Sequence, residues 1–311
     1  MDNTFAHLPF PAYYLVIVIF LFIILKWCIT FFKEKPKPIT EKLFSVLSFA
    51  GFVITFFFIT WGFNYGRIPL ETKLNLQPDT ITLQQLEDET KLTIKNLNDI
   101  RNTIKSDTNN LPQILFINNI ETNCRTALNN TLQNFKYKYS NKIRGRFLLD
   151  DMLLAFGIGG QYMPFIGEAN VDNAVYYSKK PFFLIHELAH GNGFTQEAEC
   201  NFLAYVSCVQ SSNLSLQYSG ELNYLFYLFS ELKYRNVTAF ESIFKNMPSV
   251  IIKDITTIQK YMQQHSYKSD FLGAVINNVY LKILGVPDGV KNYDKMVLLI
   301  YKWKQKNILQ D

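Results

Sequence analysis

The residues best suited to chemistry lie in one stretch, LIHELAHGNGFTQEAECN, which runs from residue 184 to residue 201. His186 and His190 are four residues apart on a predicted helix, so both imidazoles project from one face, about one turn apart. Two neutral imidazoles at this spacing can bind one zinc ion at about 2.0–2.1 Å each. Glu187 lies about a third of a turn off that face, where it can act as general base on a zinc-bound water. The stretch therefore predicts a zinc site with a catalytic base.

A third ligand is needed, because a catalytic zinc usually has three protein ligands and one open position. Only His7 and His265 remain as histidines, so a carboxylate is the better candidate. We favour Glu197, while Glu199, which points about 200° away on the same predicted helix, and His265 stay open as alternatives. If Glu197 faces the metal, Asn201 lies one turn further on and can orient a ligand histidine.

The chain must turn sharply between the two histidines and these carboxylates. Gly191 and Gly193 permit the first helix to stop and the chain to double back. Thr195 is then placed to cap the second helix at its N-terminus. The pattern predicts two short helices that meet at the metal.

Two long apolar segments precede this region. The predicted membrane spans cover about residues 12–32 and 43–63, each long enough to cross a hydrocarbon core of roughly 30 Å. Five lysines lie in or beside the segment that joins them, namely Lys26, Lys33, Lys35, Lys37 and Lys42. The lysine-rich side stays cytoplasmic, so we expect residues 1–65 to anchor the chain in the bilayer of a bacterial cytoplasmic membrane and residues 66–311 to lie on its periplasmic side. The formal net charge of +5 comes mostly from this loop, and nothing in it indicates a nucleic-acid partner.

The outer part is predicted to be mainly α-helical, in an α+β fold. Helical periodicity indicates helices over about 81–105, 120–139, 196–211, 219–234, 238–264, 268–284 and 291–305. The glycine- and aromatic-rich residues 156–183 predict one or two short strands before the motif helix. Cys200 and Cys208 are about 12 Å apart along one predicted helix, too far to bridge, whereas Cys124 could pair with either.

The arrangement HExxH followed by ExxxN, from Glu197 to Asn201, resembles the gluzincin type of zincin metallopeptidase. Together with the two spans, the segments WGFNYGR (61–67), PFIGEAN (164–170), NFLAY (201–205) and GVPDGVKNY (285–293) resemble a bacterial membrane family of unknown function that is grouped with zincin-like peptidases. The resemblance covers nearly the whole chain. The chain departs from the family pattern at Gly191, where a glutamine usually follows the second histidine.

The resemblance implies roles for two further residues. In zincins an extended segment before the motif helix lines the cleft, so Glu168 in GQYMPFIGEAN is a candidate to bind a substrate amine or a cation. The alternative is a turn glutamate in a short strand pair. Tyr293 matches a family position and could stabilise an oxyanion, or it could be a plain core aromatic residue.

These observations predict a membrane-anchored zinc metallopeptidase that hydrolyses peptide bonds in a peptide or protein substrate, with Zn²⁺ on His186, His190 and Glu197. The alternative is a non-catalytic zincin-like module that uses the metal for binding or assembly in the cell envelope. The intact Glu187 favours the enzyme, since a purely structural site has no use for a base at that position.

Overall fold

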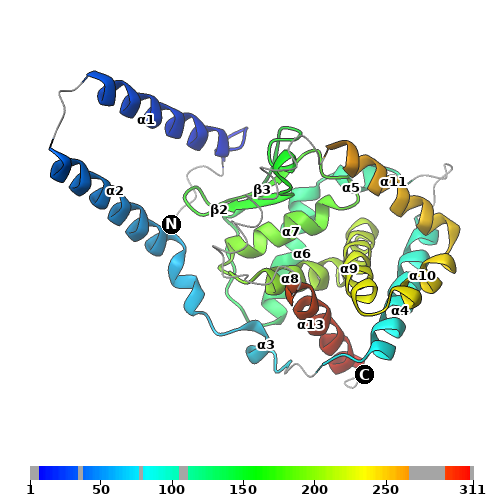
Figure 1. Cartoon of the computed structure of the whole chain (residues 1–311). Coiled ribbons are helices and arrows are strands. Elements are labelled where there is room, and N and C mark those ends of the chain that lie inside the picture. Colours follow the sequence, from blue (N-terminus) through cyan, green and yellow to red (C-terminus); the bar gives the residue numbers. More distant parts are fainter. Residues whose placement is uncertain (1–6, 34–37, 77–79, 105–110, 266–290, 309–311) are drawn as a thin grey trace.

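The computed structural model describes residues 7–33, 38–76, 80–104, 111–265 and 291–308. Within these ranges the chain is mainly helical and has one small sheet (Figure 1). The helices of the part after the two apolar segments are α3 (Leu70–Lys73), α4 (Leu83–Thr103), α5 (Ile114–Ile117), α6 (Ile120–Asn134), α7 (Lys180–Gly191), α8 (Glu197–Val209), α9 (Leu214–Arg235), α10 (Val237–Lys245), α11 (Ser249–His265) and α13 (Lys291–Ile308).

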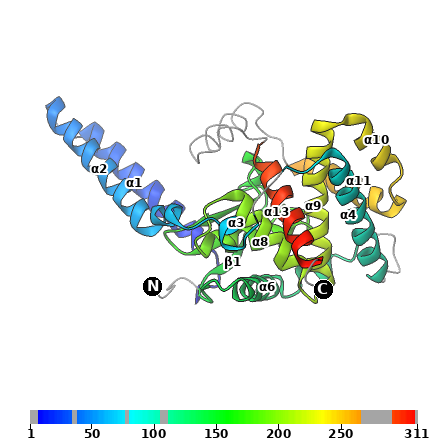
Figure 2. The ribbon, with the colours of Figure 1, turned by 90° about the horizontal axis from the view of Figure 1, so that it is seen from below.

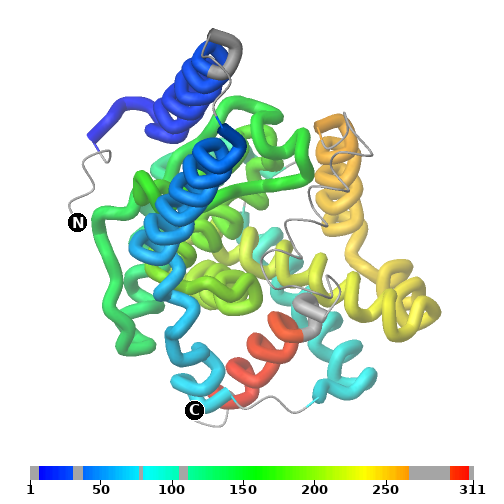
Figure 3. The backbone as a smooth tube through the Cα atoms, turned by 60° about the vertical axis from the view of Figure 1, so that its left-hand side comes forward, coloured from blue at the N-terminus to red at the C-terminus, as the bar shows by residue number. Residues whose placement is uncertain are grey.

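The two apolar segments form separate helices, α1 (Tyr13–Lys33) and α2 (Ile39–Thr60). Both are long and apolar enough to cross a membrane, and none of the residues in their apolar windows is buried in the protein. A soluble core helix would be covered on most sides, so two such exposed helices suggest a membrane anchor or a signal sequence. They extend from the same side of the helical domain (Figure 3).

The second apolar helix differs from its prediction at both ends. It begins at Ile39, directly after Pro38, because a proline is tolerated just before a first helical turn. It ends at Thr60, and residues Gly62–Gly66 continue as the short 3₁₀ helix η2. This change turns the chain from the apolar helix toward the domain.

The sheet has three strands where one or two were expected. Strand β3 (Glu168–Asp172) is central and buried along its whole length; β1 (Arg144–Leu148) pairs with it in parallel and β2 (Gly160–Met163) pairs antiparallel on its other side. Strand β1 was not predicted, since its residues RGRFL carry two arginines and lack a clear period-2 pattern. The order leaves β2 at an edge of the sheet.

The core lies where α7, α8 and α9 pack together, with α7 also covering the sheet. Helices α6 and α13 pack against α8, and α4 packs against α9. Figure 2 shows these helices gathered on one side, with α1 and α2 projecting away from them. Buried ion pairs join the outer helices: the Lys304 Nζ to Glu89 Oε1 distance is 2.6 Å, and the Arg101 Nε to Asp254 Oδ2 distance is 2.9 Å.

Candidate metal centre

Helices α7 and α8 face each other at the predicted motif. Helix α7 carries Pro181 in its first turn, where a proline costs no hydrogen bond, and buries the apolar residues Leu184, Ile185 and Leu188. The chain reverses at Gly193, whose φ of +86° is unfavourable for residues with a side chain. The predicted glycine turn is thus observed.

The cap predicted for α8 is wrong. Gln196, and not Thr195, stands at the N-cap position of α8, and its side chain makes no capping hydrogen bond. The turn around Gly193 and the packing against α7 position the helix instead.

Three side chains converge between the two helices. The Nε2 atoms of His186 and His190 are 3.1 Å apart, and the Glu197 carboxylate lies 3.1 Å from the first and 3.4 Å from the second. Two ligand atoms of a tetrahedral zinc, each at about 2.0–2.1 Å, are about 3.3 Å apart. The spacing of the three groups therefore fits a single small cation, and their residues are the only group of metal-ligand type found in the described part of the chain.

Hydrogen bonds behind the cluster select the tautomer of each histidine. The Nδ1 of His186 is 2.7 Å from Asn201 Oδ1, and the Nδ1 of His190 is 2.8 Å from the backbone oxygen of Phe194. Both partners are acceptors, so each Nδ1 carries a proton, and a neutral ring presents the lone pair of its Nε2 toward the cluster. Asn201 therefore lies where the sequence predicts it, behind one of the two candidate ligand histidines.

The electrostatics of the cluster favour a positive charge at its centre. Burial raises the pKa of Glu197, but hydrogen bonds and charge from His186 and His190 lower it well below its usual value. Burial lowers the pKa of His190, but Cys200 and Glu197 raise it more, so it lies well above its usual value. Three acceptors at this separation repel one another unless a proton or a cation lies between them.

Glu187 lies beside the edge strand. It is buried, and burial raises the pKa of its carboxyl despite the nearby histidines. The backbone of Tyr162 in β2 hydrogen-bonds this carboxylate. A Cβ atom at Gly160 would lie 2.8 Å from both Cγ and Oε1 of Glu187, so the strand approaches the glutamate as closely as a glycine allows. The base and the edge strand share one wall of the site.

The alternative ligand Glu199 has another position. It is buried on α8 and accepts a 2.6 Å hydrogen bond from the backbone N–H of Leu70, at the start of α3. Burial raises the pKa of its carboxyl. The geometry thus favours Glu197 over Glu199 as the metal ligand. The other alternative, His265, lies on α11 and pairs with Asp151 at 3.0 Å.

Glu168, the candidate for the substrate cleft, also has a different setting. It is fully buried, and its carboxylate accepts hydrogen bonds from the backbone N–H groups of Ala12 and Tyr13 at 3.1 and 3.3 Å. Arg146 Nε lies 3.6 Å from the same carboxylate. These contacts connect the sheet to the start of α1. Tyr293 falls in α13, but its side chain lies outside the described residues.

The segment after α2 also contacts the site, which was not predicted from the sequence. The ring of Trp61 lies 5.3 Å from that of Tyr162 and 6.1 Å from that of His190. Arg67 donates a 2.8 Å hydrogen bond to the backbone oxygen of Asn192, in the turn after α7. The WGFNYGR motif drew attention to this segment in the sequence, but only the tertiary structure shows which residues it contacts.

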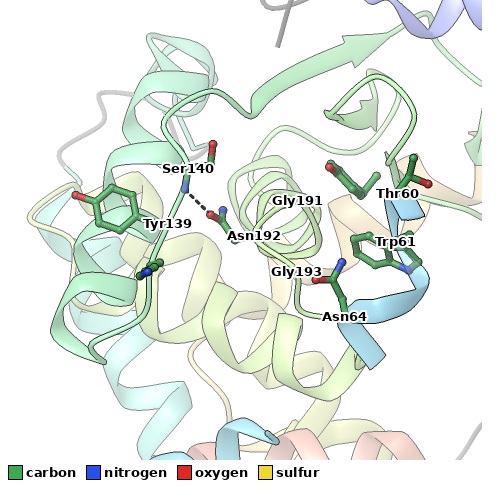
Figure 4. A pocket seen from close by; sticks show the side chains of 10 residues that line it. Thr60, Trp61, Asn64, Tyr139, Ser140, Gly191, Asn192 and Gly193 are labelled. Atoms are coloured by element: carbon green, nitrogen blue, oxygen red, sulfur yellow. Dashed lines mark hydrogen bonds between the residues drawn. The ribbon is translucent and has the colours of Figure 1, made fainter. Parts of the chain in front are cut away.

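A pocket lies next to this segment, at the end of α7. Its volume is about 360 Å³. Figure 4 shows the side chains of Trp61 and Asn64 on one side of it and those of Tyr139 and Ser140 on the other. The lining residues are Thr60, Trp61, Asn64, Lys138, Tyr139, Ser140, Tyr162, Gly191, Asn192 and Gly193.

The four cysteines are all free. Cys200 is buried behind the cluster, with its Sγ 3.4 Å from His190 Nδ1 and 3.5 Å from the backbone oxygen of Phe194. Burial raises the pKa of this thiol to about 11, so it is neutral at neutral pH.

The chain thus combines a mainly helical domain, two exposed apolar helices and a candidate metal cluster. A family model described as "Protein of unknown function (DUF3810)" matches residues 1–301, and the chain belongs to this family. No curated protein and no solved structure matches the sequence significantly.

Proposed function

We propose that this protein is a membrane-anchored, zinc-dependent peptidase of the gluzincin type. The observation that carries the proposal is the convergence of His186, His190 and Glu197 on one point, with both Nε2 atoms facing that point, beside the buried Glu187. A structural metal site needs the three ligands, but it has no need for a fourth, unliganded carboxylate with a raised pKa.

The residues have distinct roles in this proposal. His186, His190 and Glu197 would hold the zinc, which when bound supplies a Lewis acid for the substrate carbonyl. Glu187 would take a proton from the attacking water on its carboxylate and deliver it to the leaving amine. Burial suits the role of base, since a carboxylate with a raised pKa accepts a proton more readily.

Two neighbouring features would bind the substrate. Among the described strands, β2 has no strand partner on the side away from β3, and an extended peptide can pair with such an edge. The pocket beside Trp61 would receive a side chain of the peptide. These two features together would be enough to hold an extended peptide.

The anchor belongs to the same proposal. Helices α1 and α2 would both cross the cytoplasmic membrane, with the lysine-rich segment between them inside and the candidate site outside. A reporter fused after Asp311 is expected to be active on the periplasmic side. Activity of that fusion in the cytoplasm would show that the orientation is the reverse of the proposed one, and it would leave the proposed metal site untouched.

Zinc content and proteolysis test the function together. Purified full-length protein is expected to contain about one zinc per chain, His186→Ala to contain none, and Glu187→Gln to keep its zinc. New peptide ends in cells that express the wild type should be missing in cells that express Glu187→Gln. A wild type without zinc rejects the metal site. Zinc-loaded protein whose peptide ends match those of Glu187→Gln rejects the peptidase and favours a metal-binding module.

A further inference from the structure

The sheet beside the candidate site is tied to the start of the first apolar helix. Besides the bonds from Ala12 and Tyr13 to Glu168, the Tyr13 hydroxyl lies 3.2 Å from Gln161 Oε1 in β2. The backbone N–H of Leu149, just after β1, donates to the Tyr14 hydroxyl at 3.0 Å. Helix α1 therefore starts directly on the β-sheet.

The second apolar helix ends at the same place. Trp61 follows the last residue of α2, and its ring packs between Tyr162 of β2 and His190 of the cluster. One turn before the end of α2, the ring of Phe56 stacks on Phe165 in the β2–β3 turn, with centroids 5.1 Å apart. The edge strand therefore lies at the domain ends of both apolar helices (Figure 1), and the cluster lies next to the end of α2.

Exposed apolar side chains of the domain flank these two exit points. Phe165 is 44% exposed and Leu149 is 70% exposed on the sheet side, and Phe63 and Ile68, after α2, are 76% and 66% exposed. Apolar surface that continues two membrane-spanning helices is best covered by the same bilayer. The domain would thus rest with this face on the lipid.

We propose that the candidate site works at the bilayer surface and that its substrates are polypeptides embedded in the same membrane, cut just outside their membrane-spanning segment. This inference rests on the proposed peptidase function. The ring of His190 is 6.1 Å from that of Trp61, at the end of the span, and an extended chain advances about 3.3 Å per residue. Since 6.1 Å corresponds to about two extended residues, the cleaved bond should lie only a few residues, at most about five, from the end of the substrate's span.

Membrane confinement gives the physical reason for this choice of substrate. A chain in the same bilayer meets the site at a high effective concentration and at a fixed height. A soluble protein would have to insert an extended segment between the domain and the lipid surface. The exposed apolar residues would rest on the lipid there and close that gap.

Mapping of cleavage positions tests the substrate class. Peptide ends that depend on Glu187 are expected to cluster within about five residues of predicted spans of membrane proteins. Glu187-dependent ends in soluble proteins, or far from any span, would overturn the inference and leave the peptidase function intact. No Glu187-dependent ends at all would remove the proposed function and the inference with it.

A measurement without catalysis tests the placement on lipid. Phe165→Cys is spin-labelled in a Cys28→Ser background, since the other three cysteines are buried, and the full chain is placed in phosphatidylethanolamine–phosphatidylglycerol vesicles. The label should be accessible to oxygen and protected from a water-soluble nickel chelate. Tyr234→Cys, at a position 74% exposed in the last turn of α9, is the matched control and should behave in the opposite way. Equal access of the nickel chelate to both labels would overturn the placement.

Discussion

At the scale of single residues, the acceptors behind the two histidines decide which ring nitrogen is free to bind a cation. Asn201 performs this task for His186 through a 2.7 Å contact, whereas a backbone oxygen performs it for His190. Only the first of these acceptors can be removed by substitution, so Asn201 offers the direct test.

Asn201→Leu is expected to weaken zinc binding by about 10–100-fold, because His186 loses the acceptor that orients its ring. Asn201→Asp keeps an acceptor at the same place and should bind zinc at least as tightly as the wild type. Competition with a chromophoric chelator measures both affinities. Equal affinities of Asn201→Leu and the wild type would show that the contact does not orient the ring.

The two glutamates of α8 provide a matched pair. Glu197→Gln removes the charged ligand and should weaken zinc binding by more than about 100-fold, a larger loss than that of an orienting residue. Glu199→Gln should leave zinc affinity unchanged, since Gln can still accept the hydrogen bond from Leu70, with a loss of about 1 kcal/mol in stability. The same chelator titration and thermal unfolding distinguish them. A reversed order of zinc affinities would make Glu199 the ligand.

At the scale of elements, the close contact between β2 and α7 places the base beside the edge strand. Gly160→Ala puts a methyl group 2.8 Å from Glu187 and 2.9 Å from the backbone oxygen of Asn170. We expect a loss of about 1–3 kcal/mol in stability and a fall in Glu187-dependent cleavage, with zinc retained. Gly66→Ala is the control, as no atom lies within 4 Å of its added Cβ. Equal cleavage by the two variants would argue against close packing of β2 on the base.

The contact between the sheet and α1 should make stability depend on pH. Burial raises the pKa of Glu168 above the ordinary 4.5, despite the opposing contacts with Ala12 and Arg146. An acid with a raised folded-state pKa stabilises the fold below its unfolded pKa, and this contribution is lost as the pH rises through the folded value. Glu168→Gln does not titrate, so its thermal midpoint relative to the wild type should rise as the pH increases from 4 upward. A constant difference across that range in detergent solution would contradict the burial of an ionisable group there.

At the scale of the whole molecule, the candidate cation joins α7 to α8, the two helices at the centre of the core. Zinc at 100 times its dissociation constant stabilises a fold by about 2.7 kcal/mol. Removal with a chelator should therefore lower the thermal midpoint by roughly 5–10 °C. A His186→Ala/His190→Ala variant should show no such change. An equal shift in both proteins would mean that the chelator acts elsewhere.

The motif and the apolar segments could be predicted from the sequence because their signals are local. The i, i+4 spacing places His186 and His190 on one helical face whatever surrounds them, and long apolar segments form helices of the observed length. Local spacing also placed Asn201 one turn after Glu197, which is why its contact with His186 could be predicted.

The contacts of other residues depend on partners distant in sequence. Glu168 meets Ala12, 156 residues away, and Arg67 meets Asn192, 125 residues away. Strand β1 exists because β3 offers it a parallel partner, which its own residues do not indicate. The sequence by itself therefore determined which side chains are candidate metal ligands. Only the tertiary structure decided that Glu197, and not Glu199, reaches the two histidines. It also decided that the candidate site lies at the ends of the apolar helices. Both results depend on how elements distant in sequence pack together.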